Sequence, residues 1–176
     1  VIEQIAAAAH RANPAVIVMV DNCYGEFTQT AEPTSVGADL IVGSLIKNAG
    51  GGIAPTGGYI AGRAGLAALC GHRLTAPGTG RALGCTLDVL RDIYLGLYCA
   101  PGVVAEALRT SIYASCFFSR LGCETSPAFD AERNDIITSI ETGSGEGLVA
   151  VCQGIQAGSP VDSFVTPEPY AMPGYD

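Results

Sequence analysis

From residue 38 to residue 52 the chain reads Ala38-Asp39-Leu40-Ile41-Val42-Gly43-Ser44-Leu45-Ile46-Lys47-Asn48-Ala49-Gly50-Gly51-Gly52. A nearly unbroken apolar stretch ends there on a single cation, and glycines follow it at once. An apolar site disfavours a charged amine, so the pattern predicts that Lys47 is held towards its neutral, nucleophilic form. A neutral lysine amine can form a Schiff base with a carbonyl compound.

Three apolar runs predict the strands of one sheet. Residues 40–44 and 15–20 are continuous apolar runs rich in β-branched side chains, which is typical of parallel strands buried on both faces. The run 15–20 stops abruptly at Asp21-Asn22, and residues 57–62 form a shorter third candidate. Residues 1–12 predict a preceding helix that Asn13-Pro14 ends.

The later part of the chain is mainly helical in pattern. The expected elements are helices over 64–73, 86–98 with Thr86 as N-cap, 103–121 ended by Gly122, and 146–157, with a strand over 135–140. Pro101-Gly102 separates the second and third of these helices, and residues from 158 onward are mostly loop. We therefore predict an α/β fold in which residues 1–100 are half of an α/β domain and residues 101–176 begin an α+β domain.

Composition limits the class of protein. The 176 residues are nearly half apolar, 15% charged and of net charge −8, which indicates a globular chain and argues against non-specific binding to nucleic acid or to anionic membranes. No apolar run is long enough to cross a bilayer. Two isolated histidines and no C-x-x-C pair predict no metal site, and an odd number of cysteines predicts reduced core thiols in a cytoplasmic protein. The seven cysteines are Cys23, Cys70, Cys85, Cys99, Cys116, Cys123 and Cys152.

Asp21 and Lys47 follow two strands that are predicted to be parallel. Ligands of open α/β sheets bind outside the carboxyl ends of the strands, and both side chains would project there. Pyridoxal phosphate uses such a pair, because its aldehyde bonds a lysine amine and its ring nitrogen takes an acidic partner. The sequence therefore predicts a pyridoxal phosphate site with Lys47 as Schiff-base residue.

The runs Val20-Asp21-Asn22-Cys23-Tyr24-Gly25 and Ser44-Leu45-Ile46-Lys47-Asn48 resemble the two signatures of the cystathionine- and methionine-lyase family of pyridoxal-phosphate enzymes. The resemblance implies that Asp21 stabilises the ring nitrogen, that Ser44 binds the cofactor phosphate and that Lys47 carries the cofactor. Many members have threonine immediately before the lysine. Ile46 stands there in this chain, so one hydroxyl for the phosphate is missing.

Longer runs are similar to the aluminium-resistance, methionine gamma-lyase-like branch of that family. They are 21–27, 43–48, 50–55, 159–163 and 167–176. The resemblance implies the large domain of a fold type I pyridoxal-phosphate transferase, with a mainly parallel sheet, and the start of a small C-terminal domain. It also implies β- or γ-elimination on a sulfur amino acid such as methionine, cystathionine or cysteine, in a homo-oligomer of two or four subunits. The phosphate loop, the aromatic residue that stacks on the ring and the arginine for the substrate carboxylate are implied to lie outside the chain.

Simpler interpretations stay open for each residue. Lys47 could extend into water, Asp21 could only cap its turn, and Ser44 could be a hydroxyl satisfied by backbone. The glycines after Lys47 are expected to let backbone pass close to the cofactor or a partner chain. The chain starts without Met and ends in a turn-like run, so we expect an internal piece of a longer protein. The alternative function is a truncated, catalytically idle fragment, or a non-catalytic pyridoxal-phosphate-binding protein of the same fold.

Overall fold

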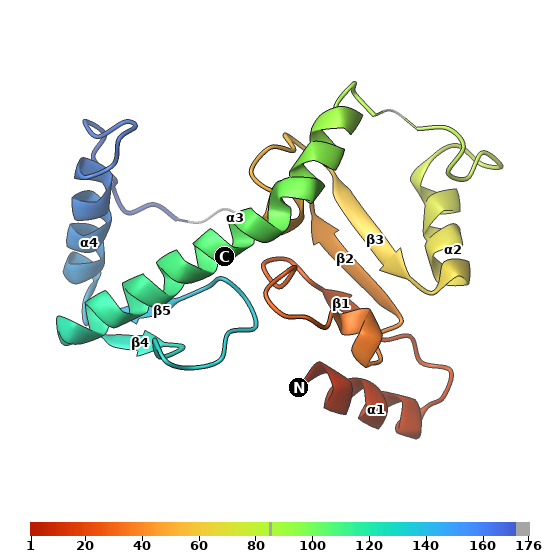
Figure 1. Cartoon of the computed structure of the whole chain (residues 1–176), viewed down its shortest axis with the longest axis horizontal. Helices are drawn as coiled ribbons and strands as arrows, with labels where there is room; N and C mark the ends of the chain where they lie inside the picture. The colour runs from red at the N-terminus through yellow and green to blue at the C-terminus, as the bar shows by residue number, and fades with distance from the viewer. Residues whose placement is uncertain (85, 172–176) are drawn as a thin grey trace. The chain divides into compact units, whose positions relative to one another are not determined.

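The computed structural model describes residues 1–84 and 86–171. It divides into two compact units, residues 1–111 with 132–137, and residues 112–131 with those from 138 onward. Each unit has its own small sheet, with strands β1, β2 and β3 in the first and β4 and β5 in the second (Figure 1). The mixed α/β class is confirmed, and the assignment of residues 1–100 and 101–176 to two domains stays a prediction.

The sheet of the first unit has β2 (Leu40–Ser44) between β1 (Met19–Asp21) and β3 (Gly58–Gly62) (Figure 1). β1 pairs with β2 in parallel, so the carboxyl ends of both strands lie at one edge. β3 pairs with β2 antiparallel. These three strands thus form one parallel and one antiparallel pair, and the mainly parallel sheet of a whole large domain stays a prediction. The segment between β2 and β3 holds only the short 3₁₀ turn η2 (Asn48–Gly50), whereas parallel strands need a longer crossover, usually through a helix.

β1 is shorter than the predicted strand 15–20. The amides of Ala15 and Val16 donate to the Asn13 side chain and carbonyl, and the Val18 amide donates to the Asp39 carboxylate at 2.8 Å. These donors are therefore not available to a strand ladder. Met19 is 61% exposed, so the prediction of burial on both faces is also wrong for β1 among the described residues.

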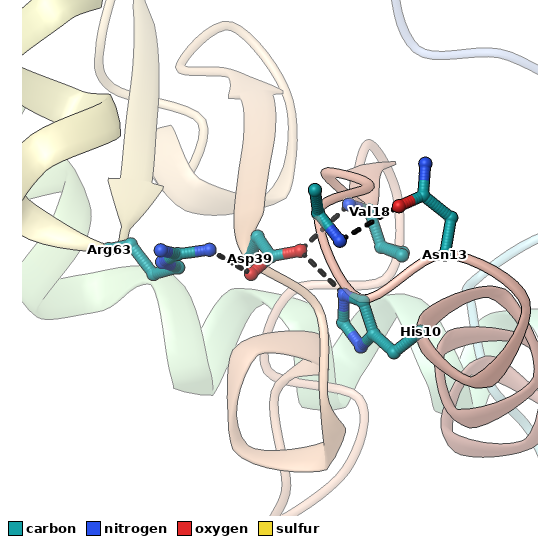
Figure 2. Close-up of polar contacts among 6 residues, drawn as sticks. His10, Asn13, Val18, Asp39 and Arg63 are labelled. Atoms are coloured by element: carbon teal, nitrogen blue, oxygen red, sulfur yellow. Dashed lines mark hydrogen bonds and ion pairs between the residues drawn. The ribbon is translucent and has the colours of Figure 1, made fainter.

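The amino end of β2 is held by Asp39, as Figure 2 shows. One carboxylate oxygen of Asp39 accepts hydrogen bonds from the Val18 amide and His10 Nε2, the latter at 3.0 Å, and the other accepts from Arg63 Nη1 at 2.9 Å. His10 comes from helix α1 (Ile2–Ala12) and Arg63 follows β3. One buried carboxylate thus joins α1, the segment before β1, and β3 at the edge opposite Lys47.

These contacts predict a specific acid sensitivity for Asp39. The hydrogen bonds from Val18 and Arg63, more than the pair with His10, lower the pKa of Asp39 to about 2 from its ordinary 3.8. Because the folded-state pKa lies below the unfolded value, the stabilisation is complete above about pH 4 and is lost as the pH falls towards about 2. In urea unfolding, the stability difference between wild type and Asp39→Asn should shrink over that interval. Asp92→Asn, which changes an exposed carboxylate on α3 (Leu90–Arg120), is the control, and a difference independent of pH would contradict the prediction.

The remaining helices largely follow the sequence pattern. The first unit has α1, the 3₁₀ helix η1 (Pro33–Val36) and α2 (Ala64–Leu74), and α3 starts there. The second unit has β4 (Glu124–Ser126), β5 (Ser139–Glu141) and α4 (Gly145–Ala157), which Ser144 caps through the Gly147 amide. The strand predicted at 135–140 begins only at Ser139, since Asp135 binds the Ile137 amide in a local turn. β4 was not predicted, and residues 158–171 hold no helix or strand.

α3 is one helix of 31 residues with Pro101 inside it. The prediction of two helices separated at Pro101-Gly102 is therefore wrong, and so is that of Thr86 as an N-cap, because the helix begins at Leu90 and Asp88 has a positive φ of 59°. A proline inside a helix removes one hydrogen bond and crowds the preceding turn. Ala100 and Val104 on either side of it are 0% and 1% exposed, so the helix is packed on both sides of the proline.

The described cysteines are unpaired, as predicted for reduced thiols, but they are less buried than core positions would be. All six are unpaired; five are partly buried and Cys152 is exposed, while Cys85 lies outside the described residues. Within the described part of the chain, no helix combines the length and apolar character needed to cross a bilayer. The same residues contain no group of three or more His, Cys, Asp or Glu side chains placed to hold a metal ion.

Candidate functional site

The three residues predicted for cofactor binding lie at one edge of the first sheet. Asp21 is the last residue of β1, Ser44 is the last of β2, and Lys47 follows Ser44 in the next turn. Asp21 lies opposite Val42 in the parallel register, and the Asn22 amide continues the ladder to the Val42 carbonyl at 2.8 Å. The two strands thus place an acid, a hydroxyl and an amine at the same end of the sheet.

Lys47 lies against the segment that follows β1. Its Nζ is 4.8 Å from the centre of the Tyr24 ring, in a cation–π contact, and the Cys23 thiol is a second neighbour that influences the pKa of the amine. Tyr24 has a φ of +72°, a left-handed backbone conformation that non-glycine residues seldom adopt outside turns and sites. The backbone turn after Asp21 therefore presents the thiol and the aromatic ring to the Lys47 amine.

The acidity of Lys47 differs from the sequence prediction. Desolvation is the largest single influence on its pKa and lowers it, but Cys23, Tyr24 and Asp21, which are negative when ionised, together outweigh it and raise the pKa above 10.5. The prediction that the apolar run favours the neutral amine is therefore wrong for this structure. The apolar residues precede Lys47 in sequence, whereas acidic groups surround its amine in space.

Asp21 is exposed and is an anion at neutral pH. Hydrogen bonds from the Cys23 amide, at 3.0 Å, and from the Cys23 thiol lower the pKa of Asp21, and the positive charge of Lys47 adds to them. The Asp21 carboxylate does cap its own turn, as the simpler interpretation held. The bond to the Cys23 amide uses one oxygen, Oδ1, and an ionised carboxylate has further acceptor positions.

Ser44 also makes local backbone contacts. Its hydroxyl oxygen accepts from the Ile46 amide at 3.3 Å, and its carbonyl accepts from the Lys47 amide at 3.3 Å. A hydroxyl that accepts one hydrogen bond still has its own proton to donate. Ser44 is thus held in the same turn as Lys47 with a donor suited to an anionic oxygen.

The glycines after Lys47 meet α3 of this same chain. A Cβ on Gly96 of α3 would overlap the Gly50 carbonyl, and one on Gly51 would overlap the Gly96 carbonyl. Leu45, Ala49 and Ala54 form a small buried core beside this contact, with Ile93 of α3 packed against it. The backbone that passes close to these glycines among the described residues is that of α3, and the expected approach to a cofactor or a partner chain stays a prediction.

Sequence reasoning missed a set of buried polar residues behind the site. Asn22 and Asn48, each directly after a predicted site residue, are both 6% exposed, and Glu26 is 3% exposed. Tyr59 of β3 bonds Glu26, and Glu32 bonds Asn22. A buried amide side chain needs hydrogen-bond partners. The repeated pattern of a site residue followed by asparagine, Asp21-Asn22 and Lys47-Asn48, could therefore have indicated a polar network behind the site.

The donor set fits pyridoxal phosphate. Asp21 would offer an ionised carboxylate to a protonated ring nitrogen, Lys47 a primary amine to the aldehyde, and Ser44 a hydroxyl to the phosphate. The first two interact electrostatically with each other, and all three come from the carboxyl ends of adjacent parallel strands.

Known proteins resemble the chain over nearly all of its length. YnbB of Bacillus subtilis is 48% identical over 164 residues, 93% of this chain and 39% of the relative. The structure of a carbon-sulfur lyase involved in aluminium resistance from Clostridium novyi is 49% identical over 97% of this chain and 41% of that chain, with a TM-score of 0.91. A Bacillus cereus structure has a TM-score of 0.93 and is 46% identical over 99% of this chain and 43% of its own.

The chain thus spans about two fifths of the length of these relatives. The family model described as methionine gamma-lyase matches residues 1–176, and the site residues at the sheet edge lie within that match. The chain belongs to the methionine gamma-lyase family.

Proposed function

We propose that this chain contributes the lysine-bearing half of a pyridoxal-phosphate site in a carbon–sulfur lyase of fold type I that acts on a sulfur amino acid such as methionine, cystathionine or cysteine. The observation that carries the proposal is the placement of Asp21, Ser44 and Lys47 at the ends of two adjacent parallel strands. The carbon–sulfur lyase from Clostridium novyi, with its TM-score of 0.91, supports the reaction class. We further propose that the intact protein is a cytoplasmic homo-oligomer.

Each residue has a defined task in this proposal. Pyridoxal phosphate, when bound, supplies an electron sink for a carbanion at the substrate Cα. Lys47 Nζ holds the cofactor and then moves protons at the substrate as base and acid. The Asp21 carboxylate keeps a proton on the ring nitrogen, because an opposite charge favours the protonated form, and the Ser44 hydroxyl donates to a phosphate oxygen.

The direct test is covalent capture of the cofactor. Pyridoxal phosphate is added to the intact protein, the product is reduced with borohydride, and peptide mass spectrometry locates the adduct. We expect the adduct on Lys47, which is the only lysine among the 176 residues. Pyridoxamine phosphate, which has no aldehyde, is the control and should give none.

A second measurement separates the enzyme from its alternative. Thiol or sulfide release from cystathionine, methionine and cysteine is measured with the cofactor-loaded protein. Capture on Lys47 with release supports the lyase. Capture without release from any sulfur amino acid would leave the non-catalytic binding protein, and an adduct that avoids Lys47 would refute the site itself.

A further inference from the structure

We propose that a network of three buried residues, Asn22, Glu26 and Asn48, and two half-buried residues, Glu32 and Tyr59, positions Asp21 and Lys47 relative to each other. This set is called the Glu26 network. These residues have no role in the proposed reaction, but their hydrogen bonds link the segments that follow β1 and β2. The inference rests on the proposed function for its purpose, whereas the geometry of the network stands independently of it.

The link on the Lys47 side runs through Asn48. Its side-chain amide donates to the Glu26 carbonyl at 3.2 Å, and both residues are buried. Asn48 is bonded covalently to Lys47, so this contact fixes the backbone that carries the amine. The Glu26 carbonyl belongs to the segment after β1, which also supplies Cys23 and Tyr24 to the Lys47 amine.

The link on the Asp21 side runs through Asn22. The side-chain amide nitrogen of Asn22 donates to Glu32 Oε2 at 2.9 Å. It also makes a longer contact of 3.5 Å with the Tyr59 hydroxyl. The Tyr59 hydroxyl donates to Glu26 Oε1 at 2.8 Å. Glu26 therefore accepts from Tyr59 with its side chain and from Asn48 with its backbone, and it connects the two asparagines.

Tyr59 fixes this network against the sheet. It lies on β3 opposite Gly43 of β2, and a side chain at Gly43 would collide with the Tyr59 ring and with Glu26 Oε1. Burial and the neighbouring Glu26 raise the pKa of Tyr59 well above its ordinary value, so its hydroxyl stays a donor at physiological pH. Truncating one partner of a buried hydrogen bond leaves the other unsatisfied, and the two site segments would then separate.

The test measures the Lys47 amine in the intact protein without any cofactor. The rate of reductive methylation of Lys47 by formaldehyde and borohydride is followed by peptide mass spectrometry as a function of pH. Asn48→Ala and Tyr59→Phe change no charged group. If they release Lys47 from the Cys23, Tyr24 and Asp21 surroundings, the pKa of its amine falls towards the ordinary value, and the methylation rate at about pH 9 rises above that of the wild type.

A control variant separates positioning from other causes. Tyr113→Phe alters an exposed tyrosine of the second unit (69% exposed) and should leave the rate profile unchanged. Wild-type profiles in both Asn48→Ala and Tyr59→Phe would overturn the inference.

Failure of this inference is distinguishable from failure of the proposed function. The methylation profile needs no pyridoxal phosphate, so it reports on Lys47 even if the wild-type protein captures no cofactor. If cofactor capture succeeds, the dissociation constant of pyridoxal phosphate should also rise in Asn48→Ala, because a displaced Lys47 would no longer be positioned relative to Asp21. Capture with unchanged affinity and unchanged methylation in both network variants would leave the site intact and refute the positioning role.

Discussion

Replacing Lys47 by arginine is expected to abolish covalent capture of pyridoxal phosphate and to lower carbon–sulfur bond cleavage by about 10²- to 10⁴-fold from the loss of proton transfer alone. Arginine keeps a cation beside the Tyr24 ring, 4.8 Å from Nζ in the wild type. Its guanidinium stays charged, so it neither bonds an aldehyde nor moves protons as lysine does. The substitution therefore separates the charge at this position from its nucleophilic chemistry.

The measurement combines borohydride capture with thiol release from a sulfur amino acid. Arg120→Ala, which removes an exposed cation at the end of α3, should retain both activities. Wild-type capture and turnover in Lys47→Arg would reject Lys47 as the cofactor lysine. Because nearby acidic groups raise the pKa of Lys47, capture by the wild-type protein should also become faster as the pH rises, as the neutral fraction of the amine increases.

Gly96→Ala is expected to lower the free energy of unfolding by about 3 kcal/mol, at the upper end of the usual cost of overpacking. A Cβ at this position overlaps the Gly50 carbonyl oxygen and lies 3.4 Å from the Ala54 amide nitrogen. Both obstacles are backbone atoms, which cannot move aside as the end of a flexible side chain can. The helix and the turn after Lys47 would have to separate, so cofactor capture should fall as well.

Gly102→Ala in the same helix is the matched control. A Cβ at Gly102 meets no atom within 4 Å, and alanine is the better helix former, so this variant should be more stable than the wild type by about 0.5–1 kcal/mol. Urea unfolding followed by circular dichroism compares the three proteins. Equal stability of Gly96→Ala and Gly102→Ala would show that the close contact with Gly50 does not constrain the fold.

Where the sequence predicted well, the signal was local. α1 ends before Asn13-Pro14, α4 begins one residue before the predicted helix 146–157, and β2 coincides with the apolar run 40–44. Each of these boundaries depends on residues within a few positions of one another. Asp21 and Ser44 end β1 and β2, and Lys47 follows in the next turn. Their positions could be predicted because each apolar run stops where polar residues begin.

Where the sequence failed, distant residues competed for the same groups. β1 is short because the Val18 amide is bonded by Asp39, 21 positions away. α3 continues through Pro101, where Ala100 and Val104 are buried by packing that no local pattern reveals. The direction of the pKa shift at Lys47 was wrong because the neighbours of its amine in space differ from its neighbours in the chain.

The sequence by itself determined the acid, the hydroxyl and the amine and placed them after strand-forming runs. It could do so because apolar runs and the polar residues that end them are local. Only the tertiary structure decided that β1 and β2 share an edge, that Cys23 and Tyr24 surround the amine, and that Asn22 and Asn48 are joined through Glu26. These relations depend on which segments pack together, and side-chain packing over long sequence separations leaves no periodic signal in the chain.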